Sequence, residues 1–120
     1  TLPGTIQGSA RTGYLGMVRI MGRDLTCLLG EGCRENGDVV VCIRPEDIEA
    51  KSGGAMSGEG WEGVVRHVTY SGESLNCEID LAGTILHTRL HPSIILREGE
   101  PVLLSFKPER AVAFPPETVL

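Results

Sequence analysis

The sequence predicts an all-β fold, a small barrel built from two related half-repeats, and three observations lead to it. The 120 residues include 16 glycines and 7 prolines. Short runs of Val, Ile, Leu and Thr lie between them, a composition typical of short strands and tight turns. Two largely apolar runs, at 39–43 and 102–106, are each followed by a basic residue, a proline and a glutamate. Glycine turns precede both runs in the same order, which indicates a duplicated unit.

The first of the two endings is Arg44-Pro45-Glu46. The apolar residues from Val39 to Ile43 before it fit a strand covered on both faces. Pro45 has no amide donor, so it ends the strand. A proline followed by Glu46 and Asp47 predicts a single helical turn, because carboxylates interact favourably with the free amides at a helix start. The second ending, Lys107-Pro108-Glu109, predicts the same short turn.

Upstream of each ending, a glycine separates two strand-like segments. In the second half, apolar and polar residues alternate from Leu75 to Leu81, which predicts a strand with one buried and one solvated face. Two hairpins are therefore expected. The segments are 17–20 and 24–29 around Gly22, and 77–81 and 84–90 around Gly83.

Three further segments complete the expected order of elements. An opening strand is expected at residues 5–10. The longest strand is expected at residues 61–70, where the turn Ser71-Gly72 ends it. Residues 92–96 are ambiguous, because Pro92 could begin a short helical turn.

The chain is expected to be a single domain, residues 1–120, with pseudo-repeat halves at about 1–50 and 61–114. Residues 51–60 are mostly small, so a linker between the halves is expected there. An all-β chain without a duplication would also show glycine turns at regular intervals. The two base-Pro-Glu endings after matching strands favour the duplication. Short strands and many glycines in a small chain favour a barrel of the oligonucleotide/oligosaccharide-binding (OB) kind.

Composition and charge exclude several classes of function. The formal net charge is −5 and the isoelectric point is about 5.1, which argues against a nucleic-acid partner, because such surfaces carry a basic stripe. No apolar run approaches the length of a membrane span. The chain begins at Thr1 rather than Met, so an excised or processed piece is expected. The 4 cysteines have no metal-ribbon spacing, and reduced thiols in a cytosolic protein are expected.

The sequence does not predict an enzyme, a cofactor site or a metal site. An active site needs a nucleophile, a base and an orienting group, or a metal cluster. His87 and His91 have a spacing that could chelate a metal on a helix, but His87 falls in a strand pattern, so a structural or solvated role is favoured for both and for His67. Ser71-Gly72 is a turn without the G-x-S-x-G frame of a nucleophile elbow.

Several of these segments resemble one known family. The run from Val41 to Ile48, which contains Arg44-Pro45-Glu46, is followed by a glycine-rich gap and then by residues 63–72. Together they resemble the transport-associated OB (TOBE) domain at the C-terminus of ATP-binding subunits of bacterial ABC importers. The ending at 99–114 and the opening at 2–6 resemble the same family, so the resemblance covers nearly the whole chain.

The resemblance implies a non-catalytic regulatory and dimerising domain, cytoplasmic and peripheral to the inner membrane. Its implied partners are its own ATPase domain, a second copy in a homodimer, and the membrane permease subunits, which it meets through the full subunit. Such importers carry polyamines, ferric iron, sugars and related solutes. ATP and Mg²⁺ would be bound by the ATPase domain, because this chain has no phosphate loop of the G-x-x-x-x-G-K-S/T type.

Two other functions stay open, and one structural role is predicted. Related OB domains hold oxyanions such as molybdate, so a small-ligand (oxyanion or solute) binding domain is the alternative, with Thr69, Ser71, Gly72 and Lys107 as the possible contacts. Nucleic-acid binding by an OB barrel is disfavoured by the charge. Arg44, Pro45, Glu46, Lys107, Pro108 and Glu109 are predicted to be structural, and Arg44 in particular to bond nearby carboxylates or carbonyls.

Overall fold

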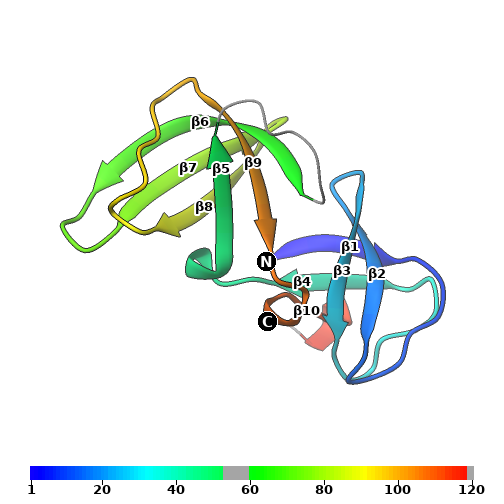
Figure 1. Cartoon of the computed structure of the whole chain (residues 1–120). Helices are drawn as coiled ribbons and strands as arrows, with labels where there is room; N and C mark the ends of the chain where they lie inside the picture. The colour runs from blue at the N-terminus through cyan, green and yellow to red at the C-terminus, as the bar shows by residue number, and fades with distance from the viewer. Residues whose placement is uncertain (53–59, 119–120) are drawn as a thin grey trace. The chain divides into compact units, whose positions relative to one another are not determined.

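The structure is a computed structural model that describes residues 1–52 and 60–118. Within these ranges the chain forms ten strands and three one-turn 3-10 helices, so the all-β prediction is confirmed (Figure 1). The chain divides into two compact units. The barrel unit consists of Thr1–Arg44 and of the chain from Lys107 on, and the open-sheet unit consists of Pro45–Phe106.

The barrel unit is a closed five-stranded barrel with the strand order β1-β2-β3-β10-β4. The last strand closes it, because β10 pairs parallel with β3 and antiparallel with β4. The buried side chains of the barrel include Ile6, Val18, Ile20, Leu29 and Val41. The elements are β1 (Leu2–Ile6), β2 (Leu15–Ile20), β3 (Arg23–Leu29), β4 (Asp38–Cys42), η2 (Pro108–Arg110), β10 (Val112–Phe114) and η3 (Pro116–Thr118).

The open-sheet unit is a five-stranded sheet with the order β5-β9-β6-β7-β8. Its buried side chains include Trp61, Val65, Ile79, Val102 and Leu104. Trp61 also lies against Phe106, with 5.5 Å between the ring centroids. The elements are η1 (Pro45–Asp47), β5 (Ile48–Ser52), β6 (Trp61–Tyr70), β7 (Leu75–Leu81), β8 (Thr84–Leu90) and β9 (Pro101–Phe106).

The two half-repeats exchange their last strands. The chain runs β1-β2-β3-β4-η1-β5 and then β6-β7-β8-β9-η2-β10, the same order of elements twice. β5 pairs antiparallel with β9 of the second copy, and β10 pairs antiparallel with β4 of the first. The registers match as well, because Ala50 lies opposite Leu104 as Ala113 lies opposite Val41. Each unit therefore contains residues of both copies.

The hairpin turns of the two copies are also alike. β2 and β3 are joined by Met21-Gly22 (φ 49° and 79°), and β7 and β8 by Ala82-Gly83 (φ 55° and 102°). Two positive φ values are characteristic of the type I′ turns that suit the twist of tight hairpins. Because both ladders start at the residue after the turn, Arg23 and Thr84 are equivalent, and so are Cys27 and Thr88.

The two copies differ in one strand pairing. In the barrel unit Val112 of β10 lies beside Leu28 of β3, whereas no ladder joins the corresponding strands β5 and β8 in the described part of the open-sheet unit. β5 carries the exposed charged residues Glu49 and Lys51 at the positions of Val112 and Phe114. Charged side chains are a common way to protect a free sheet edge.

Most expected elements are confirmed, and two are corrected. The longest described strand is Trp61–Tyr70, and η1 and η2 follow the two proline endings as predicted. The opening strand predicted at residues 5–10 is wrong: it is Leu2–Ile6, because Leu2 and Ile6 are the buried residues and the chain turns at Gly8 (φ 95°). The helical alternative for 92–96 is also wrong, since the amide of Ile94 donates to the carbonyl of His91 in a simple turn.

The boundaries of the predicted halves, about 1–50 and 61–114, stay a prediction. Of the predicted linker 51–60, Lys51 and Ser52 belong to β5, and residues 53–59 lie outside the described residues. In the parts of the chain that the structure describes, no helix has the length and apolar character needed to cross a membrane.

Candidate functional site

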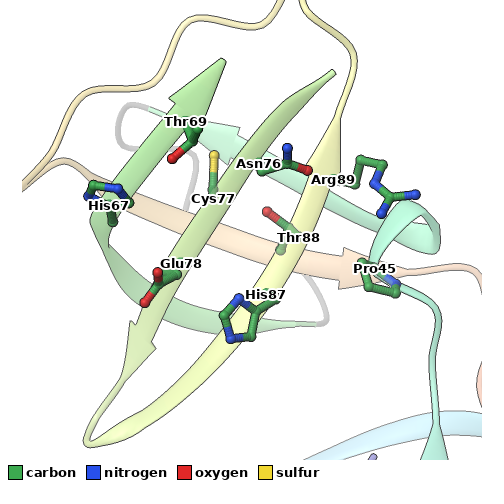
Figure 2. A pocket seen from close by; sticks show the side chains of 9 residues that line it. All are labelled: Pro45, His67, Thr69, Asn76, Cys77, Glu78, His87, Thr88 and Arg89. Carbon is green, nitrogen blue, oxygen red and sulfur yellow. The ribbon is translucent and has the colours of Figure 1, made fainter. Parts of the chain in front are cut away.

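A polar cavity of about 260 Å³ lies in the open-sheet unit, along β6, β7 and β8 and beside η1 (Figure 2). Most of the residues that line it have polar side chains, and two of the lining residues, Cys77 and Thr88, are buried. The lining residues are Pro45, His67, Thr69, Asn76, Cys77, Glu78, His87, Thr88 and Arg89.

The polar side chains form two rows across the three strands. Glu78 on β7 lies opposite His67 on β6 and His87 on β8, and Asn76 lies opposite Thr69 and Arg89 in the same way. Residues that lie directly opposite each other project from the same face of a sheet. The β6–β7 register shifts between Val65 and His67, and this irregularity brings the histidine and the threonine into line with their partners.

Three charged or titratable groups of the cavity have no partner of their own. Glu78, His87 and Arg89 make no side-chain hydrogen bond or ion pair with any residue that the structure describes. His67 differs, because its Nδ1 lies 3.4 Å from Oε1 of Glu98. Asn76 Nδ2 donates a long hydrogen bond of 3.4 Å to Ser71 Oγ. The unpartnered groups are therefore free to meet a ligand.

Thr88 and Cys77, each 2% exposed, project their side chains to the buried face of the sheet, opposite to the face that carries Glu78 and Arg89, because successive residues of a strand point to opposite faces. They lie opposite each other on β8 and β7. Burial raises the pKa of the Cys77 thiol, and the nearby Thr88 hydroxyl opposes this rise. Thr88 Oγ1 is closed to solvent and has no partner at hydrogen-bond distance among the described residues, although it lies near enough to Cys77 to lower the pKa of that thiol. A buried polar group without a partner is rare in native proteins.

Of the four residues expected as ligand contacts, Thr69, Ser71 and Gly72 lie in the open-sheet unit. Thr69 lines this cavity, and Ser71 lines a neighbouring hollow that shares Asn76 and Arg89 with it. Gly72 is in the β6–β7 turn (φ 84°), where its carbonyl accepts a hydrogen bond from Tyr70 OH at 3.3 Å. Lys107 belongs to the barrel unit, at the start of η2. A ligand role for these residues stays a prediction.

The proline endings are found as turns, but one predicted contact is not formed. Pro45 and Pro108 each begin a one-turn 3-10 helix. Arg44 is exposed and makes no side-chain hydrogen bond or ion pair within the described ranges. The expected bonds from Arg44 to carboxylates or carbonyls are therefore absent there.

The described histidines and cysteines do not gather into a metal site. His91 Nδ1 lies 2.7 Å from Ser93 Oγ and accepts from the Ser93 amide at 3.1 Å, so it stabilises a local turn. All 4 cysteines are free thiols. Among the residues described, no group of three or more His, Cys, Asp or Glu could hold a metal ion.

Asn76, Glu78, Thr88 and Arg89 were not expected at a site from the sequence. Each is a single polar residue in a strand pattern, where it normally indicates a solvated face. The signal that could have found them is the cross-strand register counted outward from the turn Ala82-Gly83, because it sets Glu78 beside His87 and Asn76 beside Arg89.

The described residues form a duplicated OB-like β domain with a polar cavity in its open-sheet unit. The sequence pattern of the TOBE domain family matches residues 41–114, and the chain belongs to this family. Among curated proteins, none matches this chain. The crystal structure of the cytoplasmic molybdate-binding protein ModG, with molybdate bound, has a similar fold. Its TM-score is 0.78 at 12% sequence identity, over 96% of this chain and 94% of that chain.

Proposed function

We propose that this chain is a non-catalytic regulatory and dimerising domain of an ABC importer ATP-binding subunit and supports ATP-driven solute import. The observation that carries the proposal is the family match over 41–114, which contains both proline endings. The domain would act in the cytoplasm at the inner membrane, attached to its own ATPase domain. That ATPase domain would bind ATP and Mg²⁺ and would connect this domain to the permease.

The matched segment covers the whole open-sheet unit and part of the barrel unit. It begins in β4 and ends in β10, and these two strands pair with each other through Val41 and Ala113. It also includes η1 and η2.

The surface of the barrel unit supports the dimerising part of the proposal. Tyr14, Leu15 and Met17 are 57%, 54% and 38% exposed and lie at or within the start of β2. Neighbouring exposed apolar side chains are typical of interaction surfaces. A second copy related by twofold symmetry is the commonest partner of a soluble chain.

The coding region upstream of Thr1 tests this proposal. We expect an ATP-binding cassette with a phosphate loop in the same reading frame. A stop codon directly before the segment, or an unrelated upstream domain, would refute the assignment to an ATP-binding subunit.

A small-ligand-binding OB domain is the second candidate. The polar cavity, with its unpartnered Glu78 and Arg89, favours it, and the molybdate-bound ModG structure supports it through the similarity of the fold. Thermal shift of the purified chain against oxyanions, polyamines and oligonucleotides tests it. Stabilisation by oxyanions or polyamines supports a ligand site, and stabilisation by oligonucleotides alone contradicts it.

A further inference from the structure

The internal repeat provides a control for the cavity of the open-sheet unit. The barrel unit builds the same hairpin with the same turn geometry, so any residue that the fold itself requires should occur in both. The five polar cavity residues of β7 and β8 do not occur in both units. Leu15, Met17, Thr26, Cys27 and Leu28 stand where the open-sheet unit has Asn76, Glu78, His87, Thr88 and Arg89.

The buried position shows the difference most clearly. Cys27 is a fully buried thiol in β3, and the equivalent Thr88 places a hydroxyl in the same interior position. Burying a hydroxyl without a partner is unfavourable, and a thiol or a methyl group avoids that cost.

The two charges of the cavity wall lie close together but do not pair. Glu78 and Arg89 are diagonal neighbours on adjacent strands, a relation in which residues are about 7–8 Å apart. Neither forms an ion pair with a described residue. In Figure 2, Arg89 lies on the side of the cavity near Pro45, whereas Glu78 lies on the side near His67 and His87. A simple anion would meet the carboxylate of Glu78, and a simple cation would meet the guanidinium of Arg89.

We infer that this cavity binds a small zwitterion, a molecule such as an α-amino acid that carries one carboxylate and one ammonium group. Arg89 pairs with the ligand carboxylate, because its planar fork suits that group. Glu78 accepts from the ammonium group, and Asn76 and Thr69 bind the polar atoms between the two ends. The inference rests on the ligand-binding candidate and specifies its ligand class.

The size of the cavity limits the ligand. A volume of 260 Å³ corresponds to on the order of nine water molecules at about 30 Å³ each. An amino acid with a short polar side chain fits this space. L-serine is therefore the probe of choice.

The test is a titration of the purified 120-residue chain with L-serine, followed by isothermal calorimetry and by amide chemical shifts. We expect saturable binding with shifts centred on β7 and β8. Glu78→Gln and Arg89→Gln should each weaken binding at least tenfold. Arg66→Gln and Glu62→Gln are matched controls, because both residues are exposed on β6 and neither lines the cavity, so they should bind like the unchanged chain.

Acetate, methylammonium, sulfate and molybdate complete the ligand panel. Each should bind at least tenfold more weakly than serine, because each satisfies only one of the two charges. Equal or tighter binding of an oxyanion, or an affinity for serine that Glu78→Gln leaves unchanged, overturns the zwitterion inference and leaves the ligand-binding candidate in place. If no probe binds when it is added at 10-fold excess over about 1 mM chain, both the zwitterion inference and the ligand-binding candidate are overturned.

Discussion

Replacing Thr88 by valine should stabilise the unliganded chain. The substitution exchanges a buried, unpartnered hydroxyl for a methyl group of nearly the same volume. In most proteins such a change is destabilising, because the hydroxyl has a hydrogen bond to lose. Here the structure gives Thr88 Oγ1 no such bond among the described residues, so the sign is reversed.

The magnitude follows from the cost of an unsatisfied group. Leaving a buried hydroxyl without a partner costs about 1–3 kcal/mol in mutational data. The Cys77 thiol recovers a small part of this, since it interacts weakly with the hydroxyl. We therefore expect a gain of about 1–2 kcal/mol in the free energy of unfolding. For a chain of this length, that corresponds to a rise of roughly 3–10 °C in Tm.

Urea denaturation followed by circular dichroism, together with calorimetry, measures both quantities. Thr69→Val is the matched control: Thr69 lines the same cavity but is exposed, so its substitution should change stability by less than about 0.5 kcal/mol. If Thr88→Val lowers stability by about 1 kcal/mol or more, the hydroxyl is hydrogen-bonded in solution. The description of Thr88 as a buried hydroxyl without a partner would then be wrong.

Three further predictions concern other parts of the chain. Gly60→Ala should lower the free energy of unfolding by about 3 kcal/mol in urea denaturation, because a Cβ at this residue (φ 149°) would fall on the Leu104 carbonyl oxygen. Gly72→Ala is the milder control, since there is open space around Gly72. Equal losses of stability in the two variants would contradict the reasoning. Arg44→Ala should leave stability within about 0.5 kcal/mol, since Arg44 is exposed; a clear loss in a thermal melt would restore the structural role that the sequence predicts. Burial raises the pKa of the Cys77 thiol above its usual 9.0. The contribution of the neutral thiol to stability is therefore complete below that pH and is lost as the pH rises through the folded-state pKa. Cys77→Ala should reduce the fall of Tm with rising pH in melts from pH 8 to 11, and an unchanged fall would show that it does not come from Cys77.

The hairpins could be predicted from sequence because their signals are local. The alternation from Leu75 to Leu81 and the glycines at 22 and 83 lie within a few residues of the structure that they specify. The turns after Arg44 and Lys107 follow from a single proline each. In these segments, short-range steric and solvation effects decide the structure.

The exchange of β5 and β10 could not be predicted in this way. Both strands are short, and each pairs with a partner that belongs to the other copy of the repeat. A repeat in sequence suggests two contiguous halves, but it does not show in which unit the final strand of each half is paired. That choice depends on long-range packing.

The cavity was missed for a related reason. The row formed by His67, Glu78 and His87 depends on the register shift in β6, and no sequence pattern shows such a shift. Thr88 also looks like an ordinary strand residue, because threonine favours strands. Its burial becomes apparent only when the inward face of β8 is known.

Sedimentation equilibrium of the full ATP-binding subunit tests the proposed regulatory and dimerising role most directly. The experiment, carried out without ATP, compares the intact subunit with a truncated subunit that ends before Leu2. The account predicts a dimer with a micromolar dissociation constant for the intact subunit, and self-association at least tenfold weaker, or about 1.4 kcal/mol, for the shortened one. Equal dissociation constants would contradict the claim that this domain holds two subunits together.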